Sequence, residues 1–305
     1  MSAPRRWDVL GVGDADVDLY LRVSRLAGRD EKVLGGLLGE LPGGVVANFA
    51  CAASRMGMRT ALATIVGDDR YGEIALDGLR EASVATDLVL VKPGGRTYFC
   101  VVMLDDTGEK ALTVVETDCM SPDITDLDPE SFGEARLVHL MASDFDVTVW
   151  IAREARRRGT LVSLDIEPTT VSDDFASLLG LVDLAFPNRE GLRRLAAGDE
   201  LAGARQVLAL GPRVVVVTMG SQGCLIVSAE ETIRLPAFPV PVVDTTGAGD
   251  CFNGAFVSGY LRGWDLARCG RTAAAAAALS VTAVGSRTAQ PTLTEVERFL
   301  TERVT

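Results

Sequence analysis

Short apolar runs alternate with longer helical patterns through most of the chain, and this alternation constrains the fold more than any other feature. The apolar runs have the length of buried strands and lie at residues 7–12, 60–66, 137–141, 161–165, 184–186 and 214–219. The helical patterns lie at 47–56, 71–82, 147–158, 190–196, 201–210, 249–261, 265–283 and 293–301. The order predicts an α/β, three-layer sandwich, in which helices cover both faces of a mostly parallel central sheet.

Two pairs of segments do not follow this alternation. Residues 17–23 with 32–41, and 97–104 with 110–116, have the pattern of antiparallel strands. The second pair is joined by Asp105-Asp106-Thr107-Gly108, whose composition is typical of a turn. We expect these strands to form a small β-sheet lid, made of about 17–41 and 96–117, on a single domain spanning 1–305.

Charge and composition exclude several classes of protein. The formal net charge is −12 at pH 7, which opposes binding to a nucleic-acid backbone. The longest run of small apolar residues, 273–279, is too short to cross a membrane. The six cysteines form no C-x-x-C pair, and the N-terminus lacks the apolar core of a signal peptide. A cytoplasmic protein without nucleic-acid or membrane partners is expected.

The strongest chemical signal is the segment Asp244-Thr245-Thr246-Gly247-Ala248-Gly249-Asp250. We expect a strand at 241–243 before it and a helix after it. The turn then leaves the N–H groups of residues 247–249 without partners at a helix N-terminus, where anions bind. Asp250 could accept a proton from a hydroxyl while the amides stabilise a transferring phosphoryl group. An aspartate near a helix N-cap is also common without any ligand.

The segment resembles the C-terminal signature of the PfkB, or ribokinase-like, carbohydrate kinase family, and the resemblance covers nearly the whole chain. It implies that Asp250 is the catalytic base and that Gly247, Ala248 and Gly249 form an anion hole. It also implies a ribokinase-like fold, with ATP and Mg²⁺ as cofactors. The expected substrate is a small polyol: a sugar, sugar derivative or nucleoside phosphorylated on a hydroxyl, expected to be primary.

Two N-terminal segments resemble substrate-binding parts of the same family. Asp18 falls where an aspartate binds sugar hydroxyls, and Asp16 falls where members often carry asparagine. Gly43, Gly44 and Asn48 match the N-terminal signature, in which glycines admit the substrate to the backbone. A carboxylate can accept two hydroxyl hydrogen bonds, which suits a polyol. A solvated acidic turn and an ordinary loop before a helix remain the alternatives for these two segments.

The resemblance also assigns a nucleotide site and cation sites. Thr218, Gly220 and Gly223 would contact ATP with Asn188 and Thr245, although a glycine turn between two strands is, for 218–223 taken alone, the commoner explanation.

The family's N-x-x-E region matches only in part. The fourth position, where a glutamate is expected, is Gly191, so either the adjacent Glu190 or water would take over the magnesium role. A monovalent cation, K⁺, is implied near Asp244, the Thr246 carbonyl and residues 281–285.

Other readings follow from single residues. Asp165, at a strand end, could face phosphates or cap a helix, and His139 is expected to be a buried polar residue. Gly11-x-Gly13 begins a dinucleotide-binding pattern, but Asp16 stands where its third glycine belongs. The chain has neither a P-loop nor a G-x-S-x-G motif.

A non-catalytic sugar- or nucleotide-binding regulator remains the alternative function, and a homodimer through the lid is a further expectation.

Overall fold

The computed structural model describes residues 5–105, 110–169, 171 and 174–303. Its main element is a nine-stranded sheet, counted over these residues, with strand order β13-β12-β11-β10-β9-β8-β1-β4-β5. The strands are β1 (Trp7–Val12), β4 (Thr60–Gly67), β5 (Val89–Lys92), β8 (Ala135–Met141), β9 (Leu161–Ile166), β10 (Leu184–Pro187), β11 (Val214–Thr218), β12 (Cys224–Ser228) and β13 (Thr232–Leu235). From β5 to β11 every neighbouring pair is parallel, which confirms the predicted sheet type.

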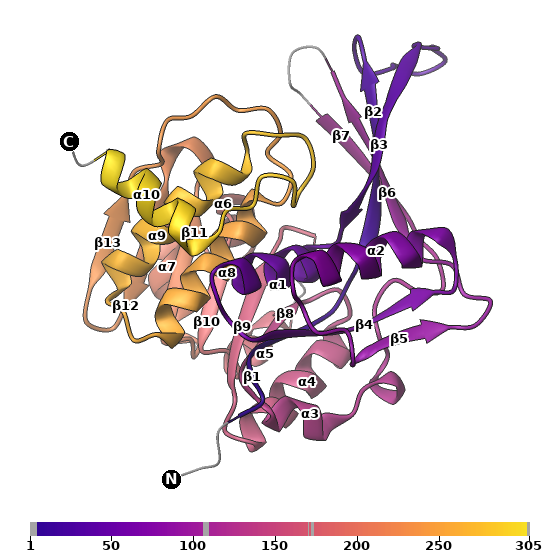
Figure 1. The fold of residues 1–305 in the computed structure, drawn as a ribbon. Coiled ribbons are helices and arrows are strands. Elements are labelled where there is room, and N and C mark those ends of the chain that lie inside the picture. Colours follow the sequence, from indigo (N-terminus) through magenta and orange to yellow (C-terminus); the bar gives the residue numbers. More distant parts are fainter. Residues whose placement is uncertain (1–4, 106–109, 170, 172–173, 304–305) are drawn as a thin grey trace.

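Helices cover both faces of this sheet (Figure 1). One face carries α1 (Val45–Arg55), α2 (Arg70–Glu81), α8 (Ala248–Leu261), α9 (Leu266–Ser280) and α10 (Leu293–Glu302). The other carries α3 (Pro129–Gly133), α4 (Phe145–Arg157), α5 (Phe175–Leu179), α6 (Arg189–Leu195) and α7 (Glu200–Ala209). No described helix has both the length and the apolar character that crossing a membrane requires.

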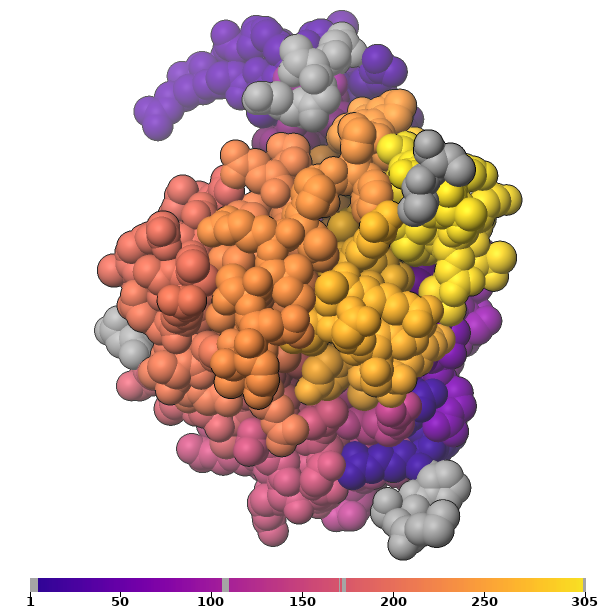
Figure 2. Space-filling model, turned by 90° about the vertical axis from the view of Figure 1, so that its left-hand side faces the viewer, coloured from indigo at the N-terminus to yellow at the C-terminus, as the bar shows by residue number. Residues whose placement is uncertain are grey.

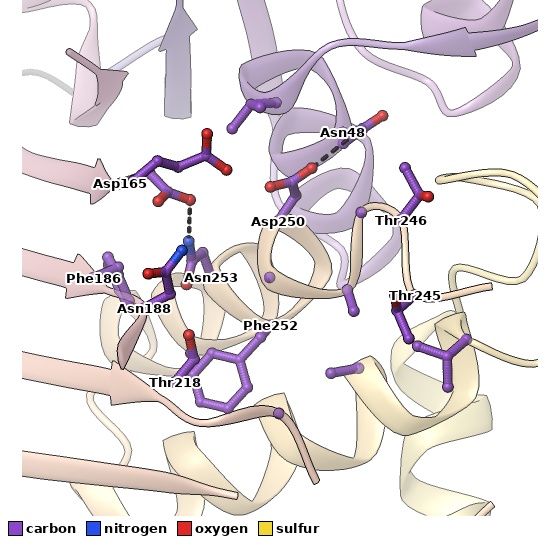
Figure 3. Close-up of a pocket in the computed structure, with 18 of the residues that line it drawn as sticks. Asn48, Asp165, Phe186, Asn188, Thr218, Thr245, Thr246, Asp250, Phe252 and Asn253 are labelled. Atoms are coloured by element: carbon purple, nitrogen blue, oxygen red, sulfur yellow. Dashed lines mark hydrogen bonds between the residues drawn. The ribbon is translucent and has the colours of Figure 1, made fainter. Parts of the chain in front are cut away.

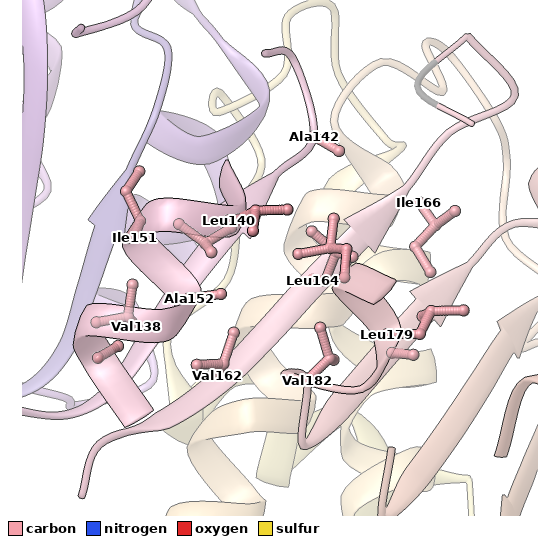
Figure 4. Packing of buried hydrophobic residues seen from close by; sticks show 14 of the residues in the cluster. Val138, Leu140, Ala142, Ile151, Ala152, Val162, Leu164, Ile166, Leu179 and Val182 are labelled. Atoms are coloured by element: carbon pink, nitrogen blue, oxygen red, sulfur yellow. The ribbon is translucent and has the colours of Figure 1, made fainter. Parts of the chain in front are cut away.

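Alternate residues of one strand supply the cores on the two faces. On β8, Val138 and Leu140 pack with Ile151 and Ala152 of α4 (Figure 4). Leu137, which precedes Val138, packs on the opposite face with the helices α1 and α8. A strand buried on both faces reads as a continuous apolar run, which is why these strands could be identified from the sequence. The predicted three-layer arrangement is confirmed.

A second sheet stands apart from the three layers. It contains β2 (Asp16–Val23), β3 (Gly35–Gly43), β6 (Phe99–Leu104) and β7 (Lys110–Val115), in the order β3-β2-β6-β7. The pairs β2–β3 and β6–β7 are antiparallel as predicted, and β2 joins β6 in parallel. The sheet projects from one end of the molecule (Figures 1 and 2). Residues 106–108 of the predicted turn lie outside the described residues.

One predicted strand is wrong, and several strands were not predicted. Residues 241–243 form no strand; they run as an irregular segment in which Val242 is 62% exposed. Pro239 and Pro241 lack the N–H groups that a ladder needs, and only Val243 and Asp244 bond to the carbonyl of Val281. The strands β5, β12 and β13 were missed, since β5 and β13 are short and only half buried.

Candidate active site

The carboxyl ends of the parallel strands meet the small sheet and the start of α8 around one large cavity. Its volume is about 1360 Å³. Most predicted site residues line it: Asp16, Asp18, Gly44, Asn48, Asn188, Thr218, Gly220, Gly223, Thr245, Thr246, Gly247, Ala248, Gly249 and Asp250. Gly43 and Asp244 lie directly behind the lining, and Glu190 lies outside it. Ligands of open parallel sheets bind at this edge.

The glycine turn before α8 has the geometry of an anion site. Gly247 is the N-cap of α8 and has φ 75°, a left-handed conformation, and no side chain caps the helix. A β-carbon at Gly247 would lie 2.7 Å from that of Ser286, whereas one at Gly249 would meet nothing within 4 Å. Of the amides predicted to be unpaired, that of Ala248 donates a long 3.3 Å hydrogen bond to the carbonyl of Thr245.

Asp250 lies in the first turn of α8 and lines the cavity (Figure 3). Its side chain accepts a 2.9 Å hydrogen bond from Nδ2 of Asn48. Burial, and then the charge of Asp165, raise the pKa of Asp250 well above its usual value, while the Asn48 hydrogen bond opposes this rise. None of the ion pairs among the described residues includes Asp250, so a cation does not neutralise it directly.

Two further acids lie opposite Asp250. Asp165, the penultimate residue of β9, accepts a 2.7 Å hydrogen bond from Asn253 of α8 (Figure 3). Burial, and then the charge of Glu167, raise the pKa of Asp165 to about 8. Burial also raises the pKa of Glu167, which lines the same cavity. Asp165 therefore faces the cavity and α8 rather than capping a helix.

The end of the cavity below the small sheet is lined by buried carboxylates. Burial raises the pKa of Asp18 to about 6, although Arg287 opposes the rise. Burial and the neighbouring Asp18 raise the pKa of Asp16 well above its usual value. A side chain on Gly43 would overlap both carboxylates, and Gly44 has φ 95°. These acids are not a solvated turn, since their exposure is below 5%.

Asp14 has a structural role, although it lies among the other acids of the cavity. Its carboxylate accepts hydrogen bonds from the amides of Val45 and Val46 at the start of α1, and from the hydroxyl of Tyr98. These bonds fix the first turn of α1, from which Asn48 projects into the cavity.

The opposite end of the cavity combines backbone turns with an apolar wall. Asn188 caps α6 by accepting a 2.7 Å hydrogen bond from the amide of Gly191, and it pairs with Thr218 of the next strand. Gly220 and Gly223, with φ 56° and 84°, turn the chain from β11 into the antiparallel β12. The wall consists of Phe238, Val240, Val242, Phe252, Ala274, Ala277 and Val281.

Comparison with known proteins decides the family. A model described as pfkB family carbohydrate kinase matches residues 8–293. The chain belongs to this family. The predicted resemblance is confirmed, and so is the predicted activity, that of an ATP-dependent sugar or nucleoside kinase.

Relatives and solved structures agree with this assignment. An ATP-dependent ribose-1-phosphate kinase of Halopiger xanaduensis is 32% identical, over 97% of this chain and 98% of its own. A nucleoside kinase of Methanothermobacter thermautotrophicus is 29% identical, over 96% and 95%. The structure of Arabidopsis thaliana ribokinase complexed with ribose and ATP has a TM-score of 0.83 at 28% identity, covering 98% of this chain and 99% of that one. None of these is a non-catalytic regulator.

In this kinase the N-x-x-E region departs from the family for a steric reason. A β-carbon on Gly191 would collide with the carbonyl oxygen of Ile166, so no glutamate fits there in this conformation. Glu190 is exposed and pairs with Arg193. The residue after Ile166 is Glu167, which lines the cavity. The sequence analysis missed Glu167; the glycine at the expected glutamate position was the signal that another acid was needed.

Lys110, at the start of β7, is a second residue that the kinase sequence did not reveal. Its Nζ donates a 2.8 Å hydrogen bond to Oγ1 of Thr246 and lies 3.8 Å from Oδ1 of Asp244. Burial alone would raise the pKa of Asp244, but hydrogen bonds from Gly285 and Thr246 lower it overall. Lys110 therefore links the small sheet to the turn that carries Asp250.

His139, as expected, is a buried polar residue. Its Nδ1 lies 2.8 Å from Oγ of Ser163, and its ring stacks on Phe49. Burial lowers the pKa of His139 to about 3, so the ring is neutral at neutral pH.

Proposed function

We propose that this kinase transfers the γ-phosphoryl group of ATP to a primary hydroxyl of a small, uncharged polyol, with Asp250 as the general base. One observation carries the proposal: Asp250 adjoins the uncapped amino end of α8, inside the cavity that also holds the Asp16–Asp18 pair. A base and an anion site side by side are what in-line phosphoryl transfer needs.

In this mechanism, one group accepts the proton of the hydroxyl and others stabilise the charge of the phosphoryl group. Asp250 takes the proton of the attacking hydroxyl, and its raised pKa makes its ionised form a stronger base than an exposed aspartate. The N–H groups after Gly247 and the positive end of the α8 dipole stabilise the transferring phosphoryl group.

The polyol occupies the end of the cavity beneath the small sheet. Its other hydroxyls donate to Asp18 and Asp16, while Gly43, Gly44 and Asn48 shape the floor. The small sheet acts as a lid, formed by about 17–41 and 96–117, that closes over the polyol and excludes water. Its hydrogen bond from Lys110 to Thr246 supports closure towards the phosphate end.

ATP occupies the other end of the cavity. Its base lies against the apolar wall, and Thr245, Asn188, Thr218, Gly220 and Gly223 contact its ribose and phosphates. The positive φ values of the two glycines support this role, because they let the backbone approach a ligand closely.

Magnesium accompanies the nucleotide in solved relatives; a putative ribokinase II from E. coli is described in complex with ATP and Mg²⁺. Asp165 and Glu167 are carboxylates that line the cavity near Asp250, and such oxygens suit this cation. We assign them the role first given to Glu190, whose side chain points to Arg193. When bound, Mg²⁺ neutralises charge on the phosphates.

A monovalent cation, K⁺, is proposed beside Asp244, the Thr246 carbonyl and residues 281–285. The buried Asp244, whose pKa is lowered by hydrogen bonds, supports a cation there, and the amide of Gly285 already bonds to its Oδ2 at 2.9 Å. Turnover that is equal in KCl and in tetramethylammonium chloride would refute this part of the proposal.

The charges around the cavity favour an uncharged substrate. Among the described residues, Lys110 is the only lysine or arginine that lines it. Carboxylates are abundant in comparison: Asp14, Asp16, Asp18, Glu116, Asp165, Glu167 and Asp250. A phosphorylated sugar would meet mainly like charges.

A phosphorylated pentose is the second candidate substrate. The 32% identity to a ribose-1-phosphate kinase favours it, and Lys110 could bind its phosphate. Coupled ADP-release assays with ribose, adenosine, cytidine and ribose 1-phosphate separate the two. Turnover with ribose 1-phosphate alone would refute the uncharged polyol, and no ADP release above ATPase background with any polyol tested would refute the proposed reaction.

The proposal also covers the cellular location and the oligomeric state of the kinase. A reducing, cytoplasmic compartment is supported by six cysteines that are all buried and unpaired in the described structure. A homodimer through the lid is supported by the exposed Leu37 and Leu38 of the edge strand β3 and by Leu34 just before it. Light scattering should give a dimer mass that Leu37→Asp lowers to that of a monomer.

A further inference from the structure

The loop between α9 and α10 contacts several residues in and behind the wall of the cavity. The amide of Gly285 donates to Asp244, and Ser286 packs against Gly247. Arg287 donates from Nη2 to the carbonyl of Gly43. The loop also binds Asn48, which accepts hydrogen bonds from Ser286, Arg287 and Gln290.

These bonds determine which way the Asn48 amide faces. Oδ1 of Asn48 accepts from Nε of Arg287 at 2.7 Å and from Oγ of Ser286 at 3.0 Å. A guanidinium group has donors and no acceptor, so it can bond only to the amide oxygen. The Nδ2 group must then point to Asp250, to which it donates at 2.9 Å. Figure 3 shows this bond across the top of the cavity.

The reversed amide would be unfavourable at both ends. Turned by half a rotation, Asn48 would present its NH₂ group to the guanidinium and its oxygen to the Asp250 carboxylate. Asn48 and Arg287 are more than nine-tenths buried, so water could not compensate for the lost bonds.

We infer that Arg287 is a positioning residue that acts through Asn48, holding the amide so that it orients Asp250 as the base. The inference rests on the proposed function. One oxygen of Asp250 is then committed to Asn48, and the other remains for the substrate hydroxyl.

The charged groups around Asp250 define what the loss of this bond would do. Asp165, Glu167 and Asp14 all disfavour its ionised form, while Lys110 attracts it. The hydrogen bond from Asn48 is the contact that lowers the Asp250 pKa against burial and these acids. Without a fixed Asn48, the pKa of Asp250 rises further.

The direct test is the pKa of Asp250 itself, measured by ¹³C NMR titration of the aspartate carboxyl groups. The Asp250 signal is assigned by its disappearance in Asp250→Asn. Four proteins are compared: the wild type, Arg287→Met, Asn48→Ala and the double variant. Because no substrate is needed, the outcome is independent of whether the proposed reaction is correct.

The expected pattern is non-additive. Arg287→Met and Asn48→Ala each raise the pKa of Asp250 by about one unit, and the double variant shows no further rise. An unchanged pKa in Arg287→Met overturns the inference. So does an added rise in the double variant, because Arg287 would then act on Asp250 without Asn48.

A milder variant addresses folding, and an activity assay addresses catalysis. Ser286→Ala removes one of the two donors to Oδ1, and it should raise the pKa in the same direction by less. If Arg287→Met does not fold, an unchanged pKa of Asp250 in Ser286→Ala overturns the inference. In ADP-release assays with the accepted polyol, Arg287→Met should lower kcat about tenfold, shift its acidic limb to higher pH and leave KM for ATP unchanged. The surface variant Arg268→Met is the control.

Discussion

The two ends of the cavity are built in different ways. The proposed phosphate end centres on one contiguous segment, residues 244–250, in which backbone amides and Asp250 lie at the start of α8. The polyol end is assembled from β2, β3, β6, β7 and the loop after α9, which are distant in sequence. The geometry of the contiguous segment depends on one local turn, whereas the assembled end depends on how the small sheet packs. We therefore expect changes at the phosphate end to alter turnover, and changes at the polyol end to alter substrate affinity.

The largest effect is expected at the phosphate end. Asp250→Asn keeps the shape of the side chain but removes the proton acceptor, so kcat should fall by about 10² or more with little change in substrate affinity. Asp265→Asn is the matched control, since the same substitution at the N-cap of α9 retains a good capping residue. Near-normal turnover in Asp250→Asn would remove the distinction between the two ends.

The polyol end should respond in the opposite sense. Asp18→Asn removes a charged acceptor for substrate hydroxyls, so KM for the polyol should rise about tenfold or more while kcat changes less. Steady-state kinetics at saturating ATP provide the measurement. A fall in kcat at unchanged KM would mean that Asp18 acts in the chemical step.

The Mg²⁺ concentration that turnover requires tests which acid acts near the phosphate end. Glu167→Gln should raise the Mg²⁺ concentration required for half-maximal turnover about tenfold, because a carboxylate ligand is lost. Glu190→Gln, which alters an exposed acid paired with Arg193, should leave it unchanged. Equal effects of the two substitutions would return the magnesium role to the N-x-x-E region.

The smallest expected effect concerns stability. The pKa of Asp165 is raised from 3.8 to about 8, so its protonated form is favoured by the fold. Its contribution is fully present below pH 3.8 and is lost as pH rises towards 8. Asp165→Asn cannot ionise, so its unfolding free energy should fall less between pH 5 and 8 than that of the wild type. Urea titrations at several pH values provide the measurement; parallel curves would contradict the burial of an ionisable group.

The comparison also explains what the sequence could predict. The parallel strands were recognisable because both faces are buried, and residues 244–250 because turn, anion site and acid are adjacent in the chain. The irregular segment at 241–243 was read as a strand from its apolar residues alone, without weighing its prolines. Lys110 and Arg287 could not be assigned, because their roles depend on contacts with Thr246 and Asn48 that only folding creates. Glu167 could not be assigned because only the folded chain places it in the cavity wall.

The most direct test of the central claim is a crystal structure of the kinase with its accepted polyol, Mg²⁺ and a non-hydrolysable ATP analogue. The account predicts that a free oxygen of Asp250 lies about 2.6–3.2 Å from the reacting hydroxyl, with the γ-phosphate against the amides that follow Gly247. A hydroxyl bonded instead to another acid, or a nucleotide bound away from that turn, would contradict it.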